Sequence, residues 1–282
     1  MSSLLKNKKE VNHITPKIKF AVLLIGTYIS FVRWFHRFVK PKPKKIRLNG
    51  KEFIVSGNLE YILFWNINYE KNTYKIFDRF LDKNHSYIDI GAFIGAFVLY
   101  AAYLSKEVYG VEPDPIAFNE LKKNVSLNQM LKEKIRLFQQ CINHETGKVK
   151  MGNLGKGGDS TSSLHYSDSK NSWIVDGITF EEFIKENNVK DYNFVKMDIE
   201  GGEIIILPTM KDFLKKEKPT LYLSMHPIFF KDPESDTKKI MEILSIYKNI
   251  YTDDGKKIDL NYLLSNKKLK KRYAIVATDL DY

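Results

Sequence analysis

Residues 87–95 read Tyr-Ile-Asp-Ile-Gly-Ala-Phe-Ile-Gly, an apolar strand-like run that ends in a glycine turn and leads into a helix-like segment. Gly91 and Gly95 permit a tight turn and a close approach of the backbone to a ligand. A turn of this kind between a strand and a helix is typical of sheets that bind nucleotides at their carboxyl edge, although the turn alone is a weak signal. The rest of the chain decides what it binds.

Apolar runs alternate with amphipathic ones along the chain. Strand-like segments are expected at Tyr87–Ile90, Val108–Val111, Ile135–Phe138, Phe194–Met197 and Thr220–Met225. Helix-like segments are expected near Tyr69–Leu81, Ile94–Leu104, Pro115–Leu127, Thr179–Asn187, Glu203–Leu214 and Asp236–Tyr247. This alternation predicts an α/β fold with a mostly parallel sheet and helices on both faces. Asn249–Thr252 and Arg272–Ala277 could add a final strand pair.

Fingerprints for phosphate binding are absent, since neither G-x-G-x-x-G nor G-x-x-x-x-G-K-[ST] occurs in the chain. Glu112 stands at the end of the next strand, 21 residues after Gly91. A carboxylate in that place can accept hydrogen bonds from both hydroxyls of a ribose. A glycine turn, an acid for a ribose and no phosphate site together favour S-adenosylmethionine as the cofactor. The alternative is that Glu112 is a surface acid before Pro113.

Three separated blocks carry a family resemblance: Asp89–Gly95, Val111–Pro113 and Lys196–Glu203. With Tyr69-Glu70 as an entry block, residues 66–228 resemble the FkbM-type methyltransferases. The resemblance implies a class I, Rossmann-like fold that uses S-adenosylmethionine to methylate hydroxyl groups of sugars or natural products. It also implies that the Lys196–Glu203 block faces the acceptor. The residues that would hold the cofactor are Asp89, Gly91, Gly95 and Glu112.

Some positions depart from or extend that pattern. Phe93, counted with the cofactor residues, stands where the family usually has Asn and could alter the cofactor contacts. Thr209 stands where a glycine is usual, and Ser224 where an acid is common before the histidine. Ile142 and Asn143 follow the third strand and could border the adenine.

The fourth strand carries charges where apolar residues are the norm. On a strand of period two, Lys196, Asp198 and Glu200 share one face. A central parallel strand is usually apolar on both faces, so these charges need partners or a cleft. An alcohol acceptor also needs a general base near the strand ends. The expected catalytic residues are therefore Asp198, Glu200, Lys196 and His226. The alternative is that Glu200 and Glu203 only favour the first turn of the next helix.

His226 directly follows the fifth strand-like run. A neutral imidazole there can take a hydroxyl proton near physiological pH, or the residue can simply close the turn before Pro227. His144 is a weaker candidate for the base. No metal is assigned to the site, although Asp198, Glu200 and His226 could instead bind a divalent ion.

The net charge of +11 lies in the first fifty residues, which hold twelve Lys or Arg and one acid, so the remainder is neutral. Phe20–Val32 is uncharged, and as a helix it is too short for a bilayer. We expect residues 1–45 to form a membrane-associating arm and linker, with residues 17–47 on an anionic membrane surface. The apolar run could instead span the membrane or pack on the core.

Residues 46–282 are then expected to form the methyltransferase domain, with an accessory hairpin and helix at 46–80. Asn49-Gly50 predicts the hairpin, because this pair accepts the positive φ of a type I′ turn. The expected location is cytoplasmic, on or anchored to a membrane. A single cysteine, Cys141, excludes an intramolecular disulfide and a cysteine-cluster zinc site.

The expected acceptor is a hydroxyl of a carbohydrate or glycolipid, with no nucleic acid. A neutral body and the lack of an Asn/Asp-Pro-Pro-aromatic block disfavour the main alternative, a nucleic-acid methyltransferase. A degenerate binding module that keeps the fold is a third possibility. Gly152–Ser163 is either a loop over something or an ordinary surface loop. The basic run Lys267–Arg272 is either a solvated loop or a second membrane or phosphate contact.

Overall fold

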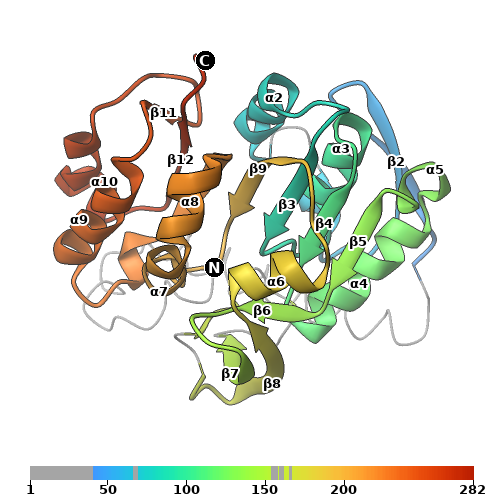
Figure 1. Cartoon of the computed structure of the whole chain (residues 1–282). Helices are drawn as coiled ribbons and strands as arrows, with labels where there is room; N and C mark the ends of the chain where they lie inside the picture. Colours follow the sequence, from blue (N-terminus) through green and yellow to red (C-terminus); the bar gives the residue numbers. More distant parts are fainter. Residues whose placement is uncertain (1–40, 66–68, 154–157, 159–161, 165–166) are drawn as a thin grey trace, which may run out of the picture. The chain divides into compact units, whose positions relative to one another are not determined.

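Seven strands form one sheet in the computed structural model, which describes residues 41–65, 69–153, 158, 162–164 and 167–282 (Figure 1). Six strands run in one direction, and β12 is antiparallel to both of its neighbours. The predicted strands, the final pair and the α/β fold class are confirmed. The order across the sheet is β11 (Asn249–Thr252), β12 (Tyr273–Thr278), β10 (Thr220–Met225), β9 (Tyr192–Met197), β3 (Ser86–Ile90), β4 (Val108–Val111) and β5 (Ile135–Phe138).

The predicted helical segments are present except at one place, and two short helices, α5 (Gln129–Lys132) and α10 (Asn266–Leu269), were not predicted. The segment predicted as one helix over Glu203–Leu214 consists of three short pieces, because Pro208 has no N–H to donate and its ring obstructs the preceding turn. The described α-helices are α2 (Lys71–Phe80), α3 (Ala96–Leu104), α4 (Pro115–Ser126), α5 (Gln129–Lys132), α6 (Phe180–Glu186), α7 (Glu203–Ile206), α8 (Lys211–Glu217), α9 (Pro233–Leu244) and α10 (Asn266–Leu269). The 3₁₀ turns are η3 (Ile62–Trp65), η5 (Leu207–Met210), η6 (Pro227–Phe229) and η7 (Leu260–Leu264).

Helices bury both faces of the sheet, and the two faces differ in chemistry. On one face, Tyr87 of β3 and Phe194 of β9 both pack edge-on against Phe77 of α2, with ring centroids 5.1 and 5.5 Å away. Two residues further along these strands, Asp89 and Lys196 continue the same face toward the carboxyl edge. The opposite face is mostly aliphatic and packs against α6, α8 and α9. Its members include Ile88, Ile90, Val195, Met197, Leu221 and Leu223.

A second, three-stranded sheet was not predicted. It consists of β6 (Gln140–Ile142), β8 (Asn171–Ile178) and β7 (Gly147–Asn153), with β6 parallel and β7 antiparallel to β8. Figure 1 shows it at the foot of the main sheet, below α6. Its buried cluster is small, with Cys141, Met151 and Val175 at its centre. Several β8 residues are exposed, so the apolar pattern that reveals a strand is weak there.

The chain divides into two compact units, one ending at Tyr69 and one from Glu70 to Tyr282. In the first unit, β1 (Lys44–Leu48) and β2 (Lys51–Val55) form the predicted hairpin, and Asn49 and Gly50 have φ of 42° and 79°. The predicted membrane arm lies largely outside the described residues, and its boundary at residue 45 stays a prediction. Among the described helices, none has both the length and the apolar character to cross a bilayer.

Candidate active site

Gly91 begins the turn between β3 and α3 with φ of 87°. A Cβ at this position would lie 1.9 Å from the main-chain oxygen of Asp198, so a larger residue would force the backbone to move. The N–H groups of Gly91 and Ala92 both donate to the Val111 carbonyl at 3.0 Å, and the Asp198 N–H donates to the Ile90 carbonyl at 2.9 Å. The turn therefore draws together the carboxyl ends of β3, β4 and β9.

Gly95 stands at the start of α3 and also has a positive φ, 91°. A Cβ there would lie 2.4 Å from Cδ1 of Leu121 in α4. Its absence lets α3 and α4 pack closely at the base of the turn. The predicted contact of Gly95 with a cofactor stays a prediction.

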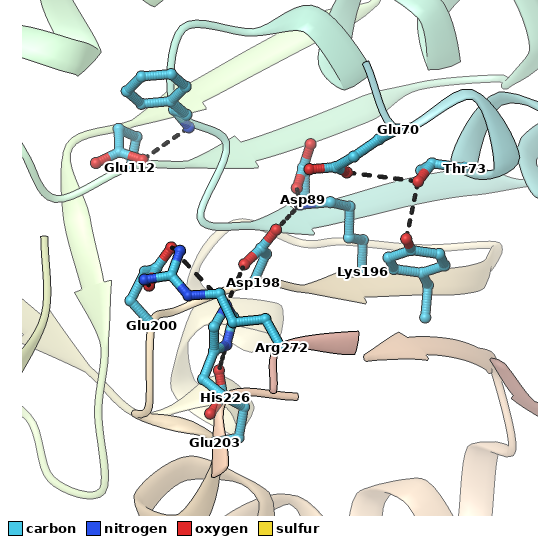
Figure 2. Close-up of polar contacts among 12 residues, drawn as sticks. Glu70, Thr73, Asp89, Glu112, Lys196, Asp198, Glu200, Glu203, His226 and Arg272 are labelled. Carbon is cyan, nitrogen blue, oxygen red and sulfur yellow. Dashed lines mark hydrogen bonds and ion pairs between the residues drawn. The ribbon is translucent and has the colours of Figure 1, made fainter. Parts of the chain in front are cut away.

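Glu112 follows β4 and is held by the backbone of two turns. Its Oε2 accepts a hydrogen bond from the Phe93 N–H at 2.7 Å, which is the dashed line at Glu112 in Figure 2. Its Oε1 accepts one from the Asp114 N–H at 2.8 Å. The side chain is buried, and burial raises the pKa of this carboxyl to about 8 although the two N–H groups oppose the shift. Phe93 adopts φ of 49°, a left-handed conformation that suits Asn better than Phe. Glu112 is thus a buried, fixed acceptor.

Asp89 and Lys196 form a fully buried ion pair, with 3.2 Å between Oδ1 and Nζ. The ammonium also lies 3.8 Å from Asp198 Oδ2 and 5.3 Å from the centre of the Phe97 ring. Burial raises the pKa of Asp89, and the Lys196 charge opposes this shift. Burial disfavours the charge of Lys196 in turn, but its acidic neighbours outweigh this and raise its pKa. The charges of the central strands are therefore paired, as their burial requires.

His226 lies between three carboxylates. Its Nδ1 is 2.8 Å from Oε1 of Glu203, while its Nε2 is 3.6 Å from Asp198 Oδ1 and 3.8 Å from Glu200 Oε1. Burial disfavours the imidazolium, but the bond to Glu203 and the three acidic charges raise the His226 pKa to about 9. The acidic neighbours thus favour the protonated ring, whereas the sequence argument for a base assumed a neutral one.

Glu200 and Asp198 differ in how their charges are balanced. Arg272 reaches both oxygens of Glu200, with NH1 at 3.2 Å from Oε1 and NH2 at 2.9 Å from Oε2. Burial nevertheless raises the Glu200 pKa to about 7. Burial also opposes the charge of Asp198, but Lys196, His226 and the Ser224 hydroxyl outweigh it and lower the Asp198 pKa. We name the connected set of charged side chains the ion-pair cluster. Its members are Asp89, Lys196, Asp198, Glu200, Glu203, His226 and Arg272.

Ile142 and Asn143 lie at the end of β6, and both are buried. The Asn143 N–H donates to the Ile178 carbonyl at 2.9 Å, and its side-chain amide donates to the Glu145 carbonyl at 3.1 Å. His144, the weaker base candidate, is half-exposed, with its Nε2 3.8 Å from Glu145 Oε1, so it does not join the ion-pair cluster. A border of Ile142 and Asn143 with an adenine stays a prediction.

The described part of Gly152–Ser163 is tied to two strand ends. Oδ2 of Asp114, beyond β4, accepts hydrogen bonds from the Gly158 N–H at 2.9 Å and the Ser162 hydroxyl at 2.7 Å. The Ser163 hydroxyl donates to the main-chain oxygen of Glu200, beyond β9, at 2.9 Å. Of the two sequence interpretations, these contacts favour a loop over the carboxyl edge of the sheet.

Two members of the ion-pair cluster were not among the expected catalytic residues. Glu203 was left open between the block that faces the acceptor and a helix-start carboxylate; it is the first residue of α7, and its oxygen also holds His226. Arg272 closes the basic run that was expected to be either a solvated loop or a second membrane or phosphate contact, and β12 begins directly after it. Its position at a strand start, beside the carboxyl end of β10, was the signal available in the sequence. Thr209, a departure from the family pattern, only donates to the Ile206 carbonyl within its turn.

A sequence profile described as the Methyltransferase FkbM domain matches residues 89–251, more than half of the chain. The chain belongs to the FkbM methyltransferase family. Proteins of this family are described as methyltransferases, for which S-adenosylmethionine is the indicated methyl donor. The resemblance inferred from the three sequence blocks is confirmed.

Individual relatives are more distant. A curated Bacillus cereus protein named "Uncharacterized RNA methyltransferase" is 31% identical over 133 residues, which cover 41% of this chain and 29% of that protein. The chain thus spans less than a third of its length. The structure of methyltransferase FkbM from Methylobacillus flagellatus KT has a TM-score of 0.45 at 18% identity, covering 69% of this chain and 43% of that one. A putative methyltransferase from Streptococcus mutans, solved with SAH, has a TM-score of 0.42 at 10% identity, covering 74% and 96%.

The described residues of this member of the FkbM family fit an adenosyl group. Each oxygen of Glu112 receives one backbone N–H, and a carboxylate oxygen has two lone pairs, so each oxygen can accept one ribose hydroxyl as well. Oδ2 of Asp89 is buried without a hydrogen-bond partner among the described residues. Together, Glu112 and Asp89 offer hydrogen-bond acceptors to a ligand that carries hydroxyl and ammonium donors.

Proposed function

We propose that this chain transfers a methyl group from S-adenosylmethionine to a hydroxyl of a carbohydrate or glycolipid at a membrane surface. One observation carries the proposal: the Asp198 end of β9 packs directly on the Gly91 turn, with the Asp198 carbonyl oxygen where a Gly91 Cβ would stand. A donor held at that turn would place its methyl group beside the carboxylates of the ion-pair cluster. Those carboxylates are the groups that an alcohol needs for proton removal.

The two turns would hold the donor. When bound, S-adenosylmethionine supplies a methyl carbon made electrophilic by its sulfonium. Glu112 would accept the ribose hydroxyls, and its backbone bonds to Phe93 and Asp114 keep it from rotating away. The ion-pair cluster has four carboxylates and three basic side chains, so its net charge is negative and favours a cation nearby.

The acceptor would meet the outer part of the ion-pair cluster. Asp198 is its partly accessible carboxylate beside the Gly91 turn, with 24% of the side chain exposed. It can accept the hydrogen bond of an acceptor hydroxyl, which points the oxygen at the methyl group and draws off the proton. Glu203 would act as a positioning residue, because it fixes the ring of His226 against Asp198 and Glu200.

The acceptor class follows from where the charge lies. Beyond the first fifty residues the chain is electrically neutral, whereas a nucleic-acid enzyme usually carries a basic surface on its folded body. The basic segment 17–47 suits anionic lipids. Glycolipid hydroxyls would lie at that same surface, within reach of a domain attached to it.

An RNA acceptor is the second candidate, favoured by the relative from Bacillus cereus named as an RNA methyltransferase. The basic run Lys267–Arg272 supports it, because Arg272 brings this run to the ion-pair cluster. Exposed lysines beside the acceptor side could contact phosphates.

Methyl transfer from radiolabelled S-adenosylmethionine to separate glycolipid and total-RNA extracts tests both candidates. We expect label in the glycolipid fraction, lost in Asp198→Asn and kept in Asp191→Asn, whose carboxylate pairs with Lys106 at the surface. Label in RNA alone would favour the second candidate. No label in either extract, with no heat of S-adenosylmethionine binding, would indicate the degenerate module.

A further inference from the structure

Three side chains at the acceptor side form a potential metal site. Asp198, Glu200 and His226 each offer one ligand atom, and the three atoms lie within 4.8 Å of one another. His226 Nε2 is 3.6 Å from an oxygen of Asp198 and 3.8 Å from one of Glu200. Ligands of one octahedral ion with bonds of about 2.1 Å lie about 3.0–4.2 Å apart. The geometry needs only small side-chain movements to close around an ion.

The histidine is already oriented as metal-binding histidines are. The Nδ1 of His226 is 2.8 Å from Oε1 of Glu203, a carboxylate with no exposed surface. The same oxygen accepts the Gly201 N–H at 3.2 Å, which fixes Glu203 in place. A carboxylate on one ring nitrogen selects the tautomer and turns the other nitrogen toward the ion. Here that other nitrogen, Nε2, faces Asp198 and Glu200.

The formal charges of the ion-pair cluster leave room for a cation. Its four carboxylates outnumber its three basic side chains, so its formal charge is negative and favours a cation. Lys196 pairs with Asp89 and lies 3.8 Å from Asp198, and Arg272 pairs with Glu200. Paired charges are what a buried site of this kind requires.

We propose that Asp198, Glu200 and His226 Nε2 bind one divalent cation, with a further coordination position open to the acceptor hydroxyl. The inference deepens the proposed function and rests on it for the identity of that hydroxyl. A site of one nitrogen and two carboxylate oxygens suits Mn²⁺ or Mg²⁺, whereas softer metals prefer ligands that contain sulfur. Glu203 is the positioning residue of the site.

The acceptor oxygen would bind the cation, which would weaken its O–H bond, and the proton would pass to Asp198, as in the proposed function, and from there to water. The oxygen lone pair forms the new C–O bond to the methyl carbon. The C–S bond breaks with its electron pair staying on sulfur, which becomes a neutral thioether.

Binding of Mn²⁺ to the metal-stripped full chain tests the site without donor or acceptor. Titration followed by calorimetry and by loss of the free Mn²⁺ electron paramagnetic resonance signal should give one ion per chain. Glu200→Gln and Asp198→Asn should each weaken binding at least tenfold. Glu203→Gln should weaken it about 10–100-fold, as removal of an orienting carboxylate does. Asp82→Asn, which removes the partner of the surface residue His85, should leave binding unchanged.

Thermal unfolding of each variant shows that it is folded before its binding is compared. No saturable binding by wild type, or equal binding by wild type and Glu200→Gln, would overturn the inference. Methyl transfer to glycolipid that persists in chelator, without Mn²⁺ binding, would reject the metal site and leave the proposed function standing. Mn²⁺ binding with no transfer to glycolipid would do the reverse.

Discussion

The carboxylates beyond β4 and β9, the strands on either side of β3, are held in different ways. Glu112 is fixed by main-chain N–H groups of Phe93 and Asp114, so its position follows from the path of two turns. Asp198 and its neighbours in the ion-pair cluster are held chiefly by other charged side chains. We therefore expect a substitution near Glu112 to act locally, whereas a substitution within the ion-pair cluster removes the partner of several charged side chains at once.

Lys196→Met should have the largest effect on stability. The substitution leaves Asp89 buried without its ion-pair partner, and breaking a buried pair in this way destabilises a protein by about 3–5 kcal/mol. The free energy of unfolding in urea measures it. The double variant Asp89→Asn/Lys196→Met should recover most of the loss. A single-variant loss below about 1 kcal/mol would show that this pair does not support the ion-pair cluster.

Glu112→Gln should change how stability depends on pH. Burial raises the Glu112 pKa to about 8 in the folded protein, against about 4.3 in the unfolded chain. Between these values the folded state binds more protons, so the free energy of unfolding of the wild type falls as the pH rises. The variant lacks this loss, so its stability relative to wild type should increase from pH 5 to pH 8.

Urea unfolding at pH 5, 6.5 and 8 measures that difference, with Asp191→Asn as an exposed control that should show no such trend. An unchanged relative stability over this range would mean that the N–H groups of Phe93 and Asp114 outweigh burial. The Glu112 pKa would then be lowered, and the carboxyl would be ionised in both the folded and the unfolded state above pH 5.

Asp114→Ala should cost about 1–2 kcal/mol of unfolding free energy, because Oδ1 caps the start of α4 by accepting from the Ile116 and Ala117 N–H groups. Asp114→Asn keeps a capping oxygen but offers an amide toward the Gly158 N–H. Asparagine should therefore cost less than alanine in chemical denaturation. Equal costs would assign the effect to the loop contact and not to the cap.

Phe93→Asn should have the smallest effect, a gain of less than about 1 kcal/mol, since Asn tolerates the left-handed backbone of this position better than Phe. The midpoint of urea unfolding measures it. A clear loss would show that the half-buried Phe93 ring contributes more through packing than its backbone costs.

The fold was predictable where one physical signal dominated. Buried strands such as Val108–Val111 are apolar runs, and Asn49-Gly50 has a single favoured turn. The small sheet escaped prediction because β8 exposes much of its length, Ile174 included, so no clean alternation marks it. The interruption of the helix at Pro208 could have been predicted, because proline cannot donate a main-chain hydrogen bond.

The site was predictable in part for a similar reason. Asp198, Glu200 and His226 end neighbouring strands, and parallel topology alone brings such residues to one edge. Arg272 directly precedes the antiparallel strand β12, whose start meets that edge only after the chain has turned back. The carboxylate–histidine bond between Glu203 and His226 depends on side-chain packing that spacing does not encode.

Calorimetric titration of the full chain with S-adenosylmethionine tests whether the Gly91 and Glu112 turns hold the adenosyl group. We expect saturable binding by wild type, binding at least tenfold weaker in Glu112→Gln, and unchanged binding in Asp191→Asn. Equal affinity of wild type and Glu112→Gln would contradict it.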